Sequence, residues 1–219
     1  MRTTAIFVIA LAAGCAGDAP STVDYARLAP IIGRSIATPD AGGEVGALAD
    51  ALMIARGGLP VGFETSGAII TGTHDGARYT YAVFCEDAAG ASITCSPQTF
   101  RAYAFVQWDS PALHRSGMWQ LEHLQSATAT ATGTSALDHE ADGFTITDVR
   151  HESIDVDLGT YVPTNGSIEA NLRITTDGDP VNVVGSITFP GRRMAIVLLG
   201  DSAYTIDLTS GATAPVIVE

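Results

Sequence analysis

Acidic side chains at alternate positions are the first candidates for chemistry in this chain. Asp138, Glu140 and Asp142 alternate and are followed by Gly143. In calcium-binding loops such carboxylates converge on the ion, while a glycine permits the sharp turn. The pattern stops there, because the twelfth position is Val149 rather than a bidentate acid. The sequence therefore indicates at most a weak calcium site, and an acidic hairpin turn is the default interpretation.

Two His-Glu pairs, His139-Glu140 and His151-Glu152, raise a second metal hypothesis. They lack the His-Glu-x-x-His spacing of a helical zinc site, so a shared ion would require the two segments to pair as strands. The sequence contains no phosphate loop, dinucleotide fingerprint or nucleophile elbow. We therefore predict no cofactor, and we favour a non-catalytic role over catalysis.

Three charges interrupt an otherwise apolar pattern between residues 144 and 158. The even-numbered positions are apolar at both ends of this segment, but the middle three are Asp148, Arg150 and Glu152. One interpretation is a polar pocket in which Arg150 is the anchor between two carboxylates. The other is a β-bulge that changes the register and turns the charges to solvent. Val149 is an apolar residue at an odd-numbered position, which favours the bulge.

The N-terminus predicts export. Arg2 precedes an apolar run, residues 5–13, that ends at Gly14 and Cys15. A membrane-spanning helix needs about 20 apolar residues, so this shorter run predicts a cleavable signal peptide over residues 1–14.

The segment Leu11-Ala12-Ala13-Gly14-Cys15 resembles the lipobox of bacterial lipoproteins, although the leucine stands one position earlier than is usual. This resemblance implies a lipid on Cys15, a tether over residues 15–22, and anchoring of the folded part to a membrane. Ala16 after the cysteine resembles lipoproteins sorted to the outer membrane. An ordinary secretory signal is the alternative.

The other two cysteines predict a disulfide. In an oxidising compartment Cys85 and Cys95 remain as an even pair once Cys15 carries lipid. They flank a short polar stretch that reads as a hairpin loop, and closing it would contribute about 2–3 kcal/mol. Two free thiols or a metal pair are the less favoured alternatives.

Composition limits the partners. The formal net charge is −13, and every cation is arginine. Such a surface repels phosphate backbones, so nucleic-acid binding is excluded, and anionic lipid is disfavoured as a binding surface. About 200 residues remain after the signal, which is enough for a single domain over residues 23–219.

Helical periodicity covers residues 21–58. Tyr25, Leu28, Ile32 and Ile36 share one face, and Pro30 is a possible kink or break. A second helix is predicted over residues 44–56 and ends at a glycine.

Strand patterns follow. Residues 77–84 and 99–109 read as strands with apolar side chains on both faces, and residues 126–135 read as a strand of small side chains rather than a linker. Residues 194–199 predict a central strand covered on both faces. We expect Trp108 and Trp119 in the core rather than on a binding platform. The predicted fold is mainly β: a curved or closed antiparallel meander sheet with two N-terminal helices packed on its apolar face.

Residues 42–51 (Gly-Gly-Glu-Val-Gly-Ala-Leu-Ala-Asp within this range) and 57–63 (Gly-Gly-Leu-Pro-Val-Gly-Phe) look like those of uncharacterised exported proteins of GC-rich Gram-negative bacteria. This resemblance implies export from the cytoplasm and implies no activity. We expect an envelope lipoprotein, located at the outer membrane, that is a binding or structural module for an envelope protein. A carrier or sensor of an apolar ligand held by the curved sheet is the alternative, and a hydrolase is the weakest hypothesis.

Overall fold

A computed structural model describes residues 23–37, 43–74, 76–110, 113–139, 144–174 and 181–216. Two helices come first, α1 (Tyr25–Ile36) and α2 (Glu44–Ala55). The strands are β1 (Glu64–Ser66), β2 (Ile69–His74), β3 (Ala77–Glu86), β4 (Ser92–Ile93), β5 (Arg101–Ser110), β6 (Leu113–Glu122), β7 (Thr128–His139), β8 (Phe144–Asp157), β9 (Val162–Ile174), β10 (Val181–Gly191), β11 (Met194–Leu199), β12 (Ser202–Asp207) and β13 (Thr213–Pro215).

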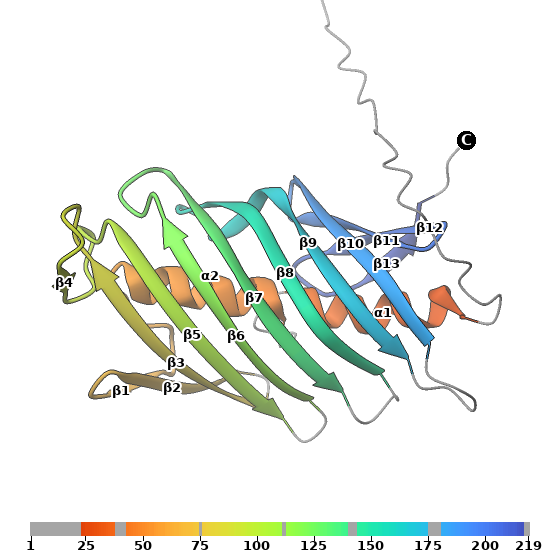
Figure 1. The fold of residues 1–219 in the computed structure, drawn as a ribbon, viewed down its shortest axis with the longest axis horizontal. Helices are drawn as coiled ribbons and strands as arrows, with labels where there is room; N and C mark the ends of the chain where they lie inside the picture. The colour runs from red at the N-terminus through yellow and green to blue at the C-terminus, as the bar shows by residue number, and fades with distance from the viewer. Residues whose placement is uncertain are drawn as a thin grey trace, which may run out of the picture.

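The strands form one antiparallel sheet in chain order from β1 to β13, except that β4 pairs only with β3. The sheet curves around the two helices, which lie end to end along its concave side (Figure 1). This confirms the predicted mainly-β meander with two N-terminal helices. The sheet is open, so of the two predicted forms the curved one is correct and the closed one is wrong.

Helix α1 is continuous through Pro30. Asp24 caps its start, because the side chain accepts a hydrogen bond of 3.1 Å from the backbone N–H of Arg27. Its apolar stripe, which includes Ile32 and Ile36, is buried and its other face is partly exposed. The helix contacts β12, β13 and α2.

Helix α2 is buried on nearly all sides, since it lies deeper in the concavity and contacts β3, β5 and β9. Its N-cap residue is Gly43, where a Cβ atom would overlap the backbone of Ala37 just after α1. The two helix ends therefore abut, which brings the C-terminus of α1 and the N-terminus of α2 to one point.

Strand β8 contains two β-bulges. Against β9 the register shifts between Ile146 and Asp148 and again between Glu152 and Asp155, and against β7 it shifts at the matching places. As a result the odd-numbered Val149 and His151 face the interior between the bulges, and the even-numbered Ile154 faces the interior after the second bulge. A single strand thus changes its inward parity without leaving the sheet.

The helices cover only one face of the sheet. In β5, Val106 is buried but Phe105 is exposed, and in β11, Val197 is buried but Leu198 is exposed. The prediction that residues 194–199 form a strand covered on both faces is therefore wrong. Within the described residues, no second layer lies over the convex face.

Two uncovered groups of apolar side chains result. The first, the aromatic patch, lies on β3, β5 and β6 and consists of Phe84, Phe105 and Met118. The second, the C-terminal patch, lies on β10 to β13 and consists of Val184, Met194, Ile196, Leu198 and Val216. Between them, β8 and β9 expose charged side chains, with Arg150 directly opposite Glu169.

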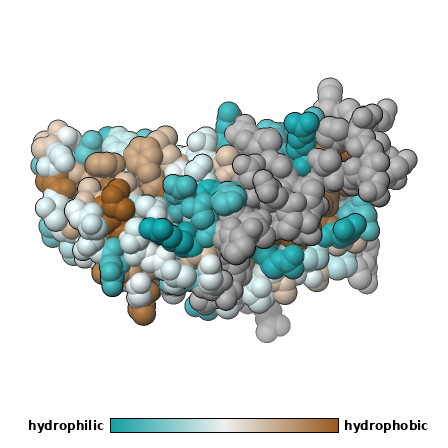
Figure 2. Space-filling model, turned by 90° about the horizontal axis from the view of Figure 1, so that it is seen from below, coloured by the Kyte–Doolittle hydropathy of each residue, from teal (hydrophilic) through white to brown (hydrophobic). Residues whose placement is uncertain are grey.

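Figure 2 shows further hydrophobic side chains at the end of the molecule that holds β1 to β3, beside hydrophilic ones. Leu59, Val61 and Ile69 are exposed in this region. Among the described residues, no helix is long and apolar enough to cross a bilayer.

Candidate functional site

A buried ion cluster joins the two helices to the sheet. Glu44, the first residue of α2, contacts the guanidinium of Arg115 on β6 and lies 2.8 Å from Nε2 of His151 on β8. All three side chains are at most 1% exposed. His151 lies between the two bulges of β8, and the first of these turns its side chain inward to complete the cluster.

Arg115 and Glu44 also interact with the ends of the two helices. Arg115 donates a 2.7 Å hydrogen bond from Nη1 to the carbonyl oxygen of Ser35, in the last turn of α1. That carbonyl is one of the four that a helix leaves without an internal partner, and a cation there complements the helix dipole. Glu44 places its negative charge in the first turn of α2, where the dipole favours an anion.

Electrostatics favour the charged form of the Glu44 carboxyl. Burial raises the pKa of the Glu44 carboxyl, but Arg115 and His151 outweigh burial, so that the net pKa is lowered. Burial lowers the pKa of the Arg115 guanidinium, and Glu44 only partly opposes this. Arg115 also lies 4.8 Å from the ring centroid of Trp108, in a cation–π contact.

A second polar cluster lies further along α2. Tyr81 donates a 3.2 Å hydrogen bond to Asp50 Oδ2, and His74 Nε2 lies 3.5 Å from the same oxygen. Burial raises the pKa of Asp50 to about 6, against the opposing effects of His74 and Tyr81. Burial, with the neighbouring carboxylate, raises the pKa of Tyr81 as well.

Stacked aromatic rings connect the two clusters. Tyr81 and Tyr79 are stacked with centroids 6.3 Å apart, and Tyr79 stacks on Trp108 at 5.9 Å. Trp119 meets His151 edge-on at 5.8 Å. Both tryptophans are fully buried, which confirms that they belong to the core rather than to an exposed platform.

These histidine–carboxylate contacts do not form a catalytic site that a substrate can reach. His151 and Glu44 are sealed between α2 and the sheet, whereas the side chains of His74 and Asp50 are 21% and 8% exposed. General acid–base chemistry requires the group to approach the proton that it moves. The arrangement instead joins four elements of the fold: α1, α2, β6 and β8.

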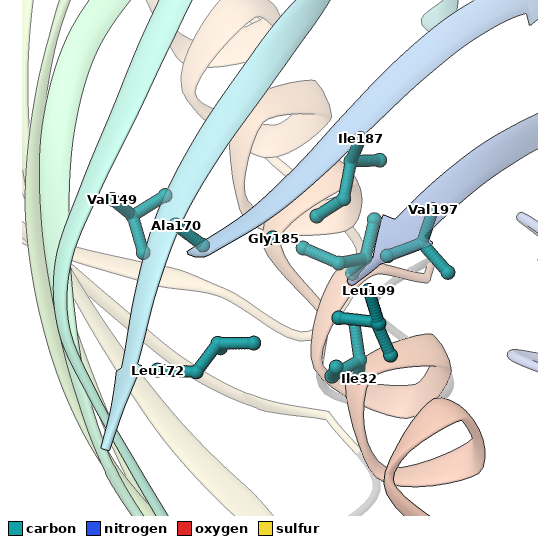
Figure 3. A pocket seen from close by; sticks show the side chains of 9 residues that line it. Ile32, Val149, Ala170, Leu172, Gly185, Ile187, Val197 and Leu199 are labelled. Atoms are coloured by element: carbon teal, nitrogen blue, oxygen red, sulfur yellow. The ribbon is translucent and has the colours of Figure 1, made fainter. Parts of the chain in front are cut away.

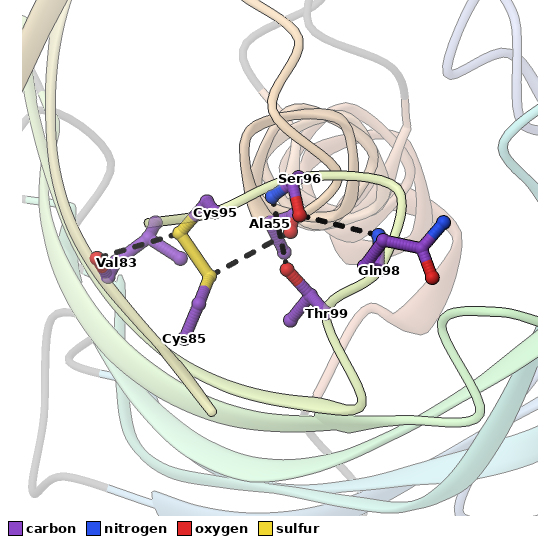
Figure 4. The surroundings of a disulfide bond; sticks show 7 residues. All are labelled: Ala55, Val83, Cys85, Cys95, Ser96, Gln98 and Thr99. Atoms are coloured by element: carbon purple, nitrogen blue, oxygen red, sulfur yellow. Dashed lines mark hydrogen bonds between the residues drawn. A yellow bond between two sulfur atoms is a disulfide. The ribbon is translucent and has the colours of Figure 1, made fainter. Parts of the chain in front are cut away.

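The disulfide is formed as predicted. Cys85 and Cys95 are bonded, and they join β3 to the segment after β4 beside the C-terminal end of α2 (Figure 4). Cys85 Sγ lies 3.6 Å from the carbonyl oxygen of Ala55, the last residue of α2. Gly57, at φ +81°, fits against the backbone of Cys95 where a side chain would not. The bond therefore fixes the hairpin against the helix.

Among the described residues, the apolar interior between α1 and the sheet is nearly filled. The cavity between α1 and the sheet measures about 10 Å³ and is lined by aliphatic residues (Figure 3): Ile32, Ile36, Val149, Ala170, Leu172, Gly185, Ile187, Val197 and Leu199. Ligand pockets of about 300 Å³ or more are usual for small molecules. No β7 residue lines this cavity, and Gly133 of that strand leaves room for the Trp119 ring instead. The geometry does not favour an interior carrier site.

A larger hollow is open and polar. It measures about 260 Å³ at the β1 edge of the sheet and is lined by Gly62, Glu64, Thr71, Gly72, Thr73 and Arg78. It exists because β1 pairs with β2 only from Glu64 onward, leaving the end of β2 uncovered. It is a shallow groove at a strand edge rather than an enclosed pocket.

The residues that the sequence predicted for a polar pocket do not lie together around one site. Arg150 and Glu152 are exposed on the convex face, so the bulge interpretation is correct for them and they do not line an interior pocket. Asp148 is part of β8, but its side chain lies outside the described part of the chain. His151 and Glu152 point to opposite faces, so the pair does not present two ligands to one metal.

The calcium prediction falls largely outside the described residues. Glu140 and Asp142 are not described, and Asp138 is described only as a backbone position in β7. Cys15, the signal peptide and the tether are not described either. Among the described residues, no group of three or more His, Cys, Asp or Glu side chains is placed to hold a metal ion.

Sequence reasoning missed Glu44, Arg115 and Asp50. An acid in the first turn of a helix is ordinary, and the interior position of Arg115 depends on strand pairing. The available signal was Asp50, a charged residue between Ala49 and Ala51 in a helix that is otherwise apolar on most sides.

The chain matches no protein-family model, no curated protein and no solved structure.

Proposed function

We propose that this protein is a lipid-anchored, non-catalytic module of the cell envelope that binds another protein through the aromatic patch. The observation that carries the proposal is the contrast between a filled interior and an uncovered aromatic group on the convex face. A module of this kind acts through its surface.

The aromatic patch has the composition of a binding surface. The rings of Phe84 and Phe105 lie edge to face with centroids 6.0 Å apart, and Met118 is directly opposite Phe105 on the next strand. Aromatic residues and methionine are enriched in protein interfaces, where a few of them supply most of the binding energy. Because these side chains stand on a rigid sheet, little conformational entropy is lost when a partner covers them.

The position of the aromatic patch relative to the anchor, together with the net charge, limits the class of partner. The aromatic patch lies on β3 to β6, at the opposite end of the molecule from the start of α1 (Figure 1). An anchor that precedes α1 would hold the other end near its membrane. The net charge of −13 disfavours nucleic acid and anionic lipid. A protein partner of the envelope is the class that remains.

The anchor is supported by the cysteine count. The disulfide uses two of the three cysteines and leaves Cys15 for modification. Intact-mass measurement of protein extracted from the producing cell's membranes should show Cys15 as the first residue, carrying acyl chains. Cys15→Ala should abolish the added mass and release the protein from the membrane fraction. An unmodified Cys15 in wild-type protein would contradict the anchor.

Site-specific crosslinking tests the binding surface. A photoreactive amino acid replacing Phe105 should give a discrete protein adduct in cells, and the same group at Glu169 should not. Glu169 is the control, because it is exposed on the same face but lies on β9, three strands away from β6. Met118→Asp should abolish the adduct at position 105. Equal labelling at both positions, or none at 105, would contradict a specific interface.

A further inference from the structure

The C-terminal patch is an apolar face that nothing in the described chain covers. Leu198 lies opposite Ala203, and the backbone N–H of Val216 donates to the Ala203 carbonyl, so these three residues form one row across β11 to β13. Val184 is 67% exposed on β10, one register step beyond the Gly185–Leu199 pair. Monomeric surfaces rarely leave such a contiguous apolar group without a partner.

The start of α1 lies beside this patch. Gly200 follows β11 directly, and its Cα packs so closely on the ring of Tyr25 that a Cβ would overlap the phenol oxygen. Tyr25 is the first residue of α1. The first turn of α1 therefore lies against the turn between β11 and β12, at the same end of the molecule as β12 and β13 (Figure 1).

The length of the preceding chain limits what can face this end. If Cys15 carries lipid, the tether of residues 16–22 spans at most about 25 Å. The bilayer that holds Cys15 is thus within reach of the C-terminal patch. A tether of this length does not allow the body to lie far from the membrane.

The local charge permits contact with a bilayer. The segment 181–216 has two arginines, Arg192 and Arg193, and two aspartates, Asp201 and Asp207, so its net charge is zero although the whole chain carries −13. Arg192, Arg193 and Asp201 lie in turns, and Asp207 is the last residue of β12, opposite Met194 at the edge of the patch. The acidic repulsion that acts on the rest of the molecule is absent here.

We propose that the C-terminal patch rests on a zwitterionic lipid bilayer and orients the body, with β11 against the membrane and the aromatic patch directed away from it. The inference rests on the lipid anchor of the proposed function. Apolar faces of this kind settle about 5–10 Å into the boundary between headgroups and acyl chains.

A chemical tether tests this surface separately from lipidation in the cell. The chain from Cys15 to Glu219, with its disulfide intact, has Cys15 as its one free thiol of three and can be coupled to a maleimide phospholipid. The vesicles contain phosphatidylcholine with brominated acyl chains, which quench nearby indoles. Trp108 and Trp119 are fully buried and give a constant background.

Val184→Trp should lose roughly half of its added emission in these vesicles relative to unbrominated ones, as expected for burial at the boundary. The matched control, Phe105→Trp, should lose almost none. Combining Val184→Trp with Leu198→Asp should reverse the loss. Equal quenching at both positions, or none at either, would overturn the proposal.

The remaining outcome concerns a second copy of the chain. If the untethered protein sedimented as a dimer that Leu198→Asp converts to a monomer, and Val184→Trp were not quenched, the patch would be a homodimer interface and the proposal would fail. Because the tether is chemical, none of these results depends on acylation of Cys15. Failure of the orientation and failure of the anchor are therefore distinguishable.

Discussion

The two halves of the interior are built from different chemistry. Around α2 the core holds ions and aromatic rings, with Glu44, Arg115 and His151 at one end and Asp50 at the other. Around α1 it is aliphatic, with Ile32 and Leu172 among the residues that surround a small cavity. Removing a buried ion from water is unfavourable and is offset only by well-placed partners, whereas aliphatic packing needs only shape and volume.

The two halves also differ in buried polar groups without hydrogen-bond partners and in the position of the disulfide. In the α2 half, the indole N–H groups of Trp108 and Trp119 and Nδ1 of His151 have no hydrogen-bond partner among the described residues. The disulfide lies in this same half, against the end of α2. A polar core with incomplete hydrogen bonding leaves a smaller margin of stability, so the covalent bond stands where it contributes most.

Removal of Arg115 should have the largest effect, because it leaves the carboxylate of Glu44 buried without its cation. We expect Arg115→Met to lower the free energy of unfolding by about 3–5 kcal/mol, measured by urea denaturation. The double variant Glu44→Gln/Arg115→Met should be more stable than the single one. Arg150→Met, on the exposed face, is the control, with a change within about 0.5 kcal/mol. A double variant no better than the single one would show that the pair is not coupled.

Asp50 should make the α2 half sensitive to pH. Its folded pKa of about 6 lies above the usual aspartate pKa of 3.8, so its contribution to stability is full below pH 4 and is lost as pH rises through 6. The loss corresponds to about 3 kcal/mol over this range. Asp50→Asn stays neutral and still accepts from Tyr81, so the difference in unfolding free energy between variant and wild type should grow in favour of the variant from pH 4 to 7.

Urea denaturation at four pH values between 4 and 7 would measure this difference. The exposed Asp201→Asn variant is the control and should track wild type at every pH. A constant offset between Asp50→Asn and wild type would contradict the assigned role of Asp50.

Loss of the disulfide should destabilise the same half by a smaller amount. The ring closes over a sequence separation of 10 residues, and we expect Cys85→Ser/Cys95→Ser to lower the unfolding free energy by about 2–3 kcal/mol. Reductant should destabilise wild type to the same extent and leave the double variant unchanged. Hydrogen exchange should increase around α2 and β3 before it increases around α1. Uniform loss of protection would argue that the halves unfold as one unit.

The smallest effect should come from the aliphatic half. Ile187, which is 1% exposed, lines the small cavity, and Ile187→Val should lower the unfolding free energy by about 0.5–1.5 kcal/mol. This change should be the same at pH 4 and pH 7, since no titratable group lines the cavity. A pH-dependent change would show that the two halves are coupled through the sheet.

Alternation along the chain was enough to predict the sheet and its aliphatic core. Residues such as Ile168 and Leu172 alternate cleanly with polar ones, and they are buried as expected. The two helices were also predictable from their apolar stripes.

The ion cluster was not predictable, because its members are far apart in sequence and their meeting depends on the pairing of β6, β7 and β8. His151 becomes interior only after the first bulge of β8. The outer face of β11 was predicted wrongly for a different reason. Apolar side chains on both faces indicate that both faces are covered, but the sequence of one chain does not say whether that cover belongs to the same molecule.

The bulges of β8 also bear on how this chain tolerates changes in length. At the second bulge, β8 has one residue more than β9 between paired positions, with Ser153 at φ +45° beside Gly166. Each bulge is equivalent to a single-residue insertion that the sheet absorbed locally. Deleting Ser153 would leave His151 and Ile154 on the inner face in regular alternation, so β8 has a position where a deletion preserves the orientation of its own inward side chains.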